Sequence, residues 1–270
     1  EDKQAIELLG KTFMIGRVQD KTLLVGATGI GKVNAAIAAT TLLAKFRVEQ
    51  VWNIGCAGHF HEGPLTIGDV LITEEFRLGD EGILTRNGVR SSREIGISIL
   101  RRENESIFES LSSSPIVHRL RKDLAAGVYR IGKERVPAAE FLPDGVALDE
   151  QGCFRLAYGP SLTVGLVSGD RRVARQRFLD YGAFAENLEG SAIAQACQHY
   201  ETPFVECRGI SNKAGDRDKL NWQLEKAVAH SHAVMLAWLI RRALAGRCPC
   251  GRGGWLGQFH DAWAHWLAGC

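Results

Sequence analysis

The sequence lacks several features that would tie it to a membrane or to nucleic acid. Its 33 basic and 31 acidic residues leave a formal net charge of only +2, so no strong field attracts phosphate backbones or anionic lipids. No apolar run approaches the ~20 residues that a membrane-spanning helix needs. The first residues, Glu1 to Gln4, carry no signal-peptide pattern. We therefore expect neither a nucleic-acid partner nor a membrane partner.

A disulfide framework is also missing from the sequence. The seven cysteines are odd in number and scattered, which is typical of a reducing compartment. There is no internal repeat and no long low-complexity segment. A chain of 270 residues with 45% hydrophobic content can bury one large core. These absences predict a cytoplasmic protein built on a single α/β domain.

The most informative part of the chain is the stretch from residue 185 to residue 215. It is predicted to form a helix, a turn at residues 201–203, and an apolar strand that ends in a polar loop. A helical projection of residues 188–200 places Glu189 near the middle of an otherwise apolar arc. A carboxylate on a buried face is costly unless something binds it. We therefore predict a ligand-facing Glu189, with a core glutamate satisfied by a neighbouring donor as the alternative.

The strand at residues 204–210 is expected to deliver two polar side chains to the same place. Arg208 and Asn212 are four positions apart, and residues separated by an even number share one face of a strand. Open α/β sheets bind ligands beyond the carboxyl ends of their strands, where Ser211 and Asn212 are expected. The pattern predicts that Glu189, Arg208, Ser211 and Asn212 meet at one end of a sheet.

Two segments of the chain are informative together: Asn187-Leu188-Glu189-Gly190 and Arg208-Gly209-Ile210-Ser211-Asn212. They resemble those of the nucleoside phosphorylase and nucleosidase superfamily. Within it, the chain is most similar to the futalosine hydrolases, which release hypoxanthine from a modified nucleoside in menaquinone biosynthesis. The resemblance extends over most of residues 22–245. It implies an α/β domain with a central mixed, twisted, partly barrel-like sheet flanked by helices. It also implies a nucleoside substrate, a homo-oligomer, and no cofactor or metal.

The resemblance divides the chain into two parts. Residues 1–246 form a phosphorylase-like domain, and residues 247–270 form a tail. Residues 80–160 contain a family-specific insertion. The segment at residues 79–82 resembles one of the futalosine hydrolases and is expected near the substrate. Relatives begin with a strand ending in a glutamate that handles the attacking water, and Glu1 is only a weak substitute. The tail predicts a short amphipathic helix with aromatic residues. A zinc site from its cysteines and histidines is the less favoured alternative, because the C-x-C spacing is tight.

Two glycine-rich segments invite ligand-binding interpretations. Residues 26–32 nearly match a P-loop, but Val33 stands where a hydroxyl should meet magnesium. The superfamily instead uses such a turn to line the water or phosphate site with backbone amides. Residues 55–58 are expected as a turn after a strand at residues 48–54. Phosphorylases carry an arginine where this chain has Asn53, so water is the expected nucleophile rather than phosphate.

The resemblance also implies roles for individual residues. Glu189 binds the ribose, Arg208 helps to hold the water side, and Asn212 faces the base. Adenine-releasing relatives carry an aspartic acid in place of Asn212, whereas an amide can bond both edges of a 6-oxopurine. The remaining substrate contacts are expected from Cys56, Ala57, Gly58, Ser168, Asn187, Leu188 and Ser211.

Three other functions stay open at this point. The chain could be a methylthioadenosine/S-adenosylhomocysteine nucleosidase, a purine nucleoside phosphorylase, or a nucleoside-binding protein that has lost catalysis. The remaining secondary-structure expectations are a helix at residues 3–9, strands at residues 12–18, 22–27 and 162–167, and helices at residues 118–126 and 220–244.

Overall fold

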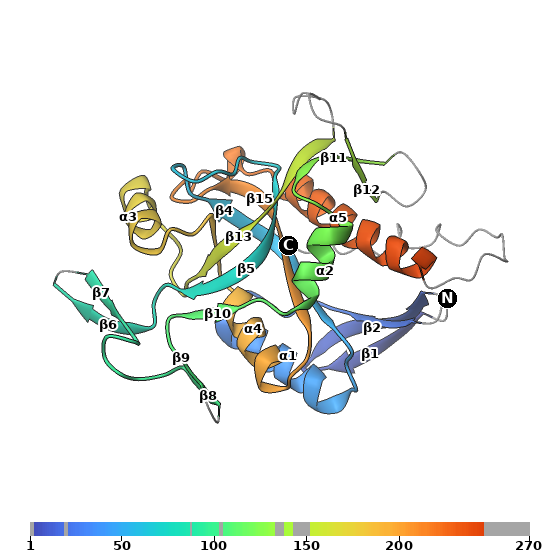
Figure 1. Ribbon diagram of the computed structural model, residues 1–270, viewed down its shortest axis with the longest axis horizontal. Helices are drawn as coiled ribbons and strands as arrows, with labels where there is room; N and C mark the ends of the chain where they lie inside the picture. The colour runs from blue at the N-terminus through green and yellow to red at the C-terminus, as the bar shows by residue number, and fades with distance from the viewer. Residues whose placement is uncertain are drawn as a thin grey trace.

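A computed structural model of the chain describes residues 3–18, 21–86, 88–102, 105–132, 138–142 and 152–245. Its largest sheet (Figure 1) contains, in spatial order, β10 (Ser110–Ser112), β5 (Val70–Leu78), β15 (Phe204–Lys213), β4 (Val51–His59), β14 (Ala185–Asn187), β13 (Cys153–Thr163), β11 (Gly127–Ile131) and β12 (Ala139–Phe141).

This sheet closes on itself. β5 pairs with both β15 and β13, so β5, β15, β4, β14 and β13 form a five-stranded ring. β4 pairs in parallel with β15, and β13 pairs in parallel with β5 and β14; the other two pairings are antiparallel. The predicted mixed, partly barrel-like sheet is confirmed.

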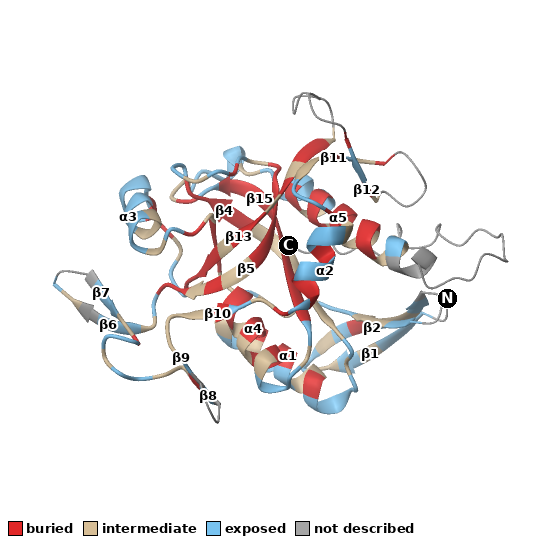
Figure 2. Cartoon of the chain, in the orientation of Figure 1, coloured by how far each residue is buried: buried red, intermediate tan, exposed pale blue. Residues whose placement is uncertain are grey.

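Helices cover the ring on more than one side. α2 (Ile116–Asp123) and α5 (Leu224–Ala245) share a buried apolar cluster with β5, β11, β13 and β15. α1 (Lys32–Lys45) and α4 (Gly190–His199) share a second cluster with β5 and β10. α3 (Arg171–Tyr181) adds Ala174 to a third cluster that includes Leu162 of β13. Figure 2 shows that the buried residues follow the ring strands and the helix faces turned toward them.

The first described segment is a hairpin, so the predicted helix at residues 3–9 is wrong. β1 (Gln4–Leu8) pairs antiparallel with β2 (Lys11–Val18), which also pairs with β3 (Lys21–Val25). Leu9 and Gly10 have φ values of 58° and 65°, and positive φ at both central residues is the geometry of a type I′ hairpin turn. The turn and the strand pairing outweigh the local apolar pattern.

Both strands that carry the predicted site run further than expected. β4 continues through residues 55–58, which were expected as a turn, and β15 continues through Ser211 and Asn212. The two strands stay paired from Val51 and Phe204 at one end to His59 and Lys213 at the other. Parallel pairing, with one register shift at Ser211, therefore keeps these polar and glycine-rich segments extended. By contrast, β13 begins at Cys153 and ends at Thr163, so the strand expected at residues 162–167 is largely misplaced.

The segment between β5 and α2 contains two hairpins that extend away from the ring (Figure 1). They are β6 (Gly82–Thr85) with β7 (Gly88–Ser91), and β8 (Leu100–Arg102) with β9 (Glu105–Ile107). No strand is predicted from the sequence in this segment. The helix expected at residues 118–126 corresponds to α2, and the one at residues 220–244 corresponds to η1 (Lys219–Asn221) followed by α5.

The expectations for Glu1 and for the tail at residues 247–270 lie outside the described residues. The limits of the domain and of the insertion stay predictions. The structure contains no described helix with the length and apolar character that a bilayer crossing requires.

Two buried histidines, His59 and His230, and the partly buried His232 make the stability of the fold depend on pH. Burial lowers the pKa of His232 to about 4 and lowers the pKa values of His59 and His230. A histidine with a depressed pKa binds fewer protons when folded than when unfolded. Its contribution to stability is therefore complete above its unfolded pKa near 6.5 and is lost as the pH falls toward the folded pKa.

We expect the free energy of unfolding to fall by about 2 kcal/mol between pH 7 and pH 5 through His232 alone. Urea unfolding at both pH values measures this loss. His232→Gln should reduce the difference between the two pH values, whereas His118→Gln, at an exposed position of α2, should leave it unchanged. An equal pH dependence in His232→Gln and the wild type would contradict the assignment.

Candidate active site

A buried carboxylate lies inside the five-stranded ring. The side chain of Glu206, on β15, is 1% exposed. Its Oε1 accepts hydrogen bonds from Thr73 Oγ1 on β5 at 2.9 Å, Ser161 Oγ on β13 at 3.1 Å and Asn187 Nδ2 on β14 at 3.4 Å. Three strands of the ring therefore each donate to one oxygen of this carboxylate.

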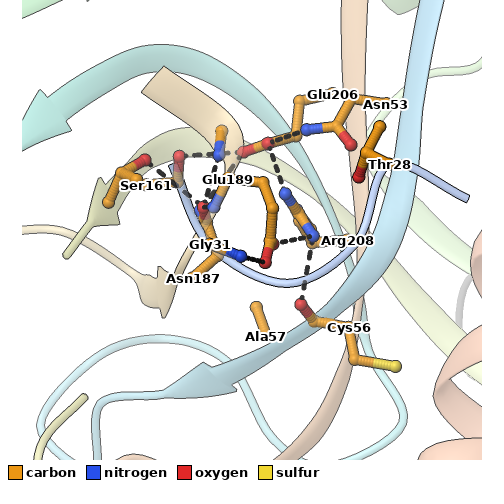
Figure 3. Close-up of polar contacts among 12 residues, drawn as sticks. Thr28, Gly31, Asn53, Cys56, Ala57, Ser161, Asn187, Glu189, Glu206 and Arg208 are labelled. Atoms are coloured by element: carbon orange, nitrogen blue, oxygen red, sulfur yellow. Dashed lines mark hydrogen bonds and ion pairs between the residues drawn. The ribbon is translucent and has the colours of Figure 1, made fainter. Parts of the chain in front are cut away.

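The other oxygen of Glu206 is bonded by the remaining two strands. Its Oε2 accepts from Asn53 Nδ2 on β4 at 2.7 Å and from Arg208 Nη2, on β15 itself, at 3.0 Å. A buried charge is tolerated only when it is paired and its lone pairs are hydrogen-bonded. Glu206 meets both conditions because every strand of the ring supplies a donor (Figure 3).

Two glycines leave the space that this cluster occupies. A Cβ atom at Gly190 would lie 2.5 Å and 2.7 Å from the two carboxylate oxygens of Glu206, and one at Gly55 would lie 2.5 Å from Arg208 Nη1. Such distances are shorter than any ordinary contact. The absence of a side chain at both positions therefore allows the buried ion pair to form.

Arg208 connects the buried carboxylate to a more accessible one. Its Nη1 lies 3.3 Å from Glu189 Oε2 and donates to the carbonyl oxygen of Cys56 at 3.4 Å. Burial by itself would lower the pKa of Arg208, but Glu206 and Glu189 together raise it above its usual value. The guanidinium is thus a permanent cation shared by two carboxylates (Figure 3).

Glu189 lies at the start of α4 and not on its buried face. It occupies the N-cap position, so the helical projection that centred it on an apolar arc was wrong. The Oδ1 atom of Asn187 accepts from the backbone amides of Glu189 and Gly190, which fixes the first turn of the helix. The side chain of Glu189 is 16% exposed and is the accessible member of the two carboxylates on Arg208.

The glycine-rich turn before α1 provides a second donor to Glu189. The backbone N–H of Gly31 donates to Glu189 Oε1 at 3.0 Å. Gly31 has a φ of 93° and caps the N-terminus of α1, where backbone amides favour negative charge. The amide that a P-loop would turn toward phosphate is therefore directed at a carboxylate of the chain itself.

The next residue ties this turn to the expected substrate-side segment. Lys32 Nζ forms salt bridges with Asp80 at 2.6 Å and Glu81 at 3.2 Å. Asp80 also accepts a hydrogen bond from the backbone amide of Gly165. The segment at residues 79–82 is thereby held beside the start of α1.

Asn212 points to a different face of β15 from the one predicted. β15 pairs with β4 up to Ile210, and Asn212 then resumes the pairing, which leaves Ser211 as an extra residue. Such a β-bulge shifts the alternation of side chains by one position. The expectation that Arg208 and Asn212 share a face was therefore wrong. The amide of Asn212 accepts from Ser211 Oγ at 2.7 Å and donates to the Lys213 carbonyl at 2.9 Å.

Arg208 and Asn212 both lie beside β4, at different points along the strand. Arg208 lies against Gly55, whereas a Cβ at Gly58 would meet Asn212 Nδ2 at 3.2 Å. Three residues along a strand span about 10 Å, which is comparable with the length of a nucleoside.

The other predicted contact residues are divided between this site and its surroundings. The carbonyl of Cys56 contacts Arg208, and the carbonyl of Ala57 accepts from Ser211 Oγ at 3.4 Å. Leu188 is partly buried against the apolar cluster beneath α3. Ala57 is also part of the buried core of the ring.

Ser168 belongs to a separate buried polar group. Its backbone amide and its hydroxyl both donate to Glu186, at 3.0 Å and 2.7 Å, and Arg177 Nη1 contacts the same carboxylate at 3.1 Å. Asp170 follows and caps α3 by accepting from two backbone amides. In the described structure the hydroxyl of Ser168 is therefore engaged within the protein.

Sequence reasoning missed Glu206 and its partners Thr73 and Ser161. One signal was available, because Glu206 and Arg208 alternate on one face of an otherwise apolar strand, which predicts a buried ion pair. The partners on other strands carry no such signal. Together, the assembled residues offer an accessible carboxylate, a shared cation and an amide at a distance. This combination suits a ligand with hydroxyl groups and a polar heterocycle.

Comparisons with known proteins agree with this geometry. A profile described as the phosphorylase superfamily matches residues 3–241. A 5′-methylthioadenosine/S-adenosylhomocysteine nucleosidase of Colwellia psychrerythraea is 28% identical over 253 residues, covering 88% of this chain and 87% of that protein. The corresponding nucleosidase of Bacillus pumilus is 28% identical over 241 residues, covering 85% of each chain.

Solved structures show the same fold. The Colwellia nucleosidase in complex with adenine superposes with a TM-score of 0.68 at 24% identity, covering 89% of this chain and 87% of that one. A futalosine hydrolase mutant of Helicobacter pylori superposes with a TM-score of 0.67 at 21% identity, covering 89% and 90%.

The fit between Gly190 and Glu206 can be tested through stability. At the first position of a helix, replacing glycine with alanine ordinarily stabilises by up to about 1 kcal/mol. We expect Gly190→Ala instead to destabilise by about 1–3 kcal/mol, because its Cβ would displace a buried carboxylate. Urea unfolding measures the sign directly. Gly169→Ala, where a Cβ would meet open space, serves as the control and should be near neutral. A stabilised Gly190→Ala protein would contradict this account.

Proposed function

Because this chain belongs to the phosphorylase superfamily, we propose that it is a purine nucleosidase that hydrolyses the N-glycosidic bond of futalosine. The products would be hypoxanthine and the remaining sugar portion, a step of menaquinone biosynthesis. The observation that carries the proposal is the position of Glu189, an accessible carboxylate held by the Gly31 amide and by a guanidinium shared with Glu206.

Glu189 is the residue that meets the ribose in this proposal. Cleavage of the bond between a purine and ribose passes through an oxocarbenium-like state. A fixed carboxylate beside the ribose hydroxyls binds the sugar and stabilises the developing positive charge. The N-cap position of Glu189 holds the carboxylate at the helix start, so little reorganisation accompanies the reaction.

The charge of the cluster favours water over phosphate as the nucleophile. Glu189, Arg208 and Glu206 together carry a formal charge of −1, and Asn53 adds a neutral amide bonded to Glu206. A phosphorylase must attract a phosphate anion and uses free cations to do so. Arg208 is already shared by two carboxylates, so in this proposal it orients a neutral water molecule on the side of the ribose away from the base.

Asn212 supports a 6-oxopurine as the leaving base. An amide can donate to the 6-oxo group and accept from a ring N–H of hypoxanthine. In the described structure, its carbonyl and amino groups bond Ser211 and Lys213, so a bound base would replace or share these contacts. An adenine-releasing enzyme benefits from an acid that protonates the base, which an amide cannot do at neutral pH.

The second candidate is a methylthioadenosine/S-adenosylhomocysteine nucleosidase. The proteins described as such in Colwellia and Bacillus align with more than four-fifths of this chain. This candidate shares the role of Glu189 but requires adenine to bind beside Asn212. The base released in a direct assay distinguishes the two.

Two further expectations are also proposals. A nucleoside-binding protein without catalysis would bind futalosine and leave it intact. A homo-oligomer would cover Ile30, just before α1, and Val33 and Ile37 within α1, which are all half or more exposed.

The full-length protein is expected to release hypoxanthine from futalosine in phosphate-free buffer. Chromatography of the released base, with inosine and methylthioadenosine as parallel substrates, measures the preference. Futalosine should give the highest kcat/KM of the three. Release of adenine from methylthioadenosine as the preferred reaction would favour the second candidate, and binding without release would favour the non-enzyme.

Asn212→Asp is expected to move the preference toward a 6-amino base. An ionised aspartate would place negative charge against the 6-oxo group, and a mismatched buried polar contact costs about 1–3 kcal/mol. Since each 1.4 kcal/mol is about tenfold in rate, the ratio of kcat/KM for matched 6-amino and 6-oxo nucleosides should rise by roughly one to two decades. Asn221→Asp, in an exposed segment before α5, is the control. A ratio that stays constant in a folded Asn212→Asp protein would show that Asn212 does not recognise the base.

A further inference from the structure

Glu206 is costly for the fold and is assigned no contact with the sugar or the base in the proposed reaction. Its carboxylate is almost fully buried, and a ring interior of this kind can be filled by apolar side chains at no net cost in stability. It nevertheless receives a donor from each of the five ring strands. Five donors that stabilise one buried carboxylate indicate that its negative charge has a function.

Arg208 lies at different distances from its two carboxylate partners. Its Nη2 lies 3.0 Å from Glu206 Oε2, whereas its Nη1 lies 3.3 Å from Glu189 Oε2. Glu189 is held closely instead by a neutral donor, the amide of Gly31 at 3.0 Å. The guanidinium therefore makes its shorter contact with the buried carboxylate, and its single positive charge is shared between two carboxylates.

We propose that Glu206 is a positioning residue that prevents Arg208 from neutralising Glu189, so that the site stays net negative for a cationic ribosyl group. The inference deepens the proposed function, because it rests on a positively charged sugar in the transition state. Without the charge of Glu206, Arg208 is free to pair bidentately with Glu189, which is the preferred geometry of an arginine with a carboxylate. The site would then be neutral and would lose its preference for a cation.

The charge can be measured with two matched ligands. One is a neutral 9-deazapurine ribonucleoside, and the other is its iminoribitol analogue, whose ring nitrogen is protonated. Both are used with a 6-oxo and with a 6-amino base, so the result does not depend on which purine the site accepts. Isothermal titration calorimetry gives the ratio of the two dissociation constants for each protein.

We expect the wild type to bind the cationic ligand at least tenfold more tightly than the neutral ligand. Glu206→Gln should reduce this preference by on the order of tenfold to a hundredfold, the effect of one charge at partly buried range. On the substrate, the same variant should lose kcat with little change in KM, because the interaction is made mainly in the transition state.

The control removes a different buried carboxylate. Asp69 is 3% exposed and accepts from Arg155 Nη2 at 2.9 Å, in the loop that leads into β5. Asp69→Asn therefore also removes the charge of a buried carboxylate paired with an arginine, although Arg155 is more exposed than Arg208. It should leave the ligand preference within about twofold of the wild type, because Asp69 is paired with Arg155 outside the cluster and solvent screens its charge.

A second variant guards against misfolding of Glu206→Gln. Combining it with Thr73→Val and Ser161→Ala removes two donors together with the charge, and removing both partners of a buried hydrogen bond costs little. The triple variant should lose the preference to the same extent. A folded variant of either kind that keeps the wild-type preference overturns the proposal, as does a wild type that binds both ligands equally. Failure of the wild type to cleave futalosine would reject that substrate alone.

Discussion

The buried charge of Glu206 is the constraint on which the rest of this structure depends. A carboxylate inside a closed ring of strands must find donors in every direction. Thr73, Ser161, Asn187 and Asn53 supply them from four strands, and Arg208 supplies the compensating charge. The interior of the ring is therefore polar at its centre, although apolar clusters pack around it.

The same cluster connects the fold to the proposed chemistry. Asn187 donates to Glu206 and also fixes the first turn of α4, which places Glu189. Arg208 contacts both carboxylates, and Gly31 extends the chain of contacts to the start of α1. The position of the Glu189 carboxylate thus depends on residues that are far apart in the sequence.

The sequence predicts the parts of this arrangement that depend on local pattern. The apolar runs identify β4 and β15, and the segments around Glu189 and Arg208 identify the family. Glu189 was misplaced because a helical projection does not apply to a residue at an N-cap. The spacing of Arg208 and Asn212 in the sequence does not reveal the bulge at Ser211, so their faces could not be predicted. The partners of Glu206 come from separate strands, and only the closed sheet brings them together.

The most direct test of the account is the fate of the sugar when phosphate is present. Futalosine is incubated with the full-length protein in saturating inorganic phosphate, and the products are followed by ³¹P nuclear magnetic resonance. Because the cluster of Glu189, Arg208 and Glu206 is net negative, we expect free sugar and no new phosphate ester. Phosphate should not increase the rate of cleavage. Formation of a sugar 1-phosphate would contradict the account, because it would require the site to bind and orient an anion.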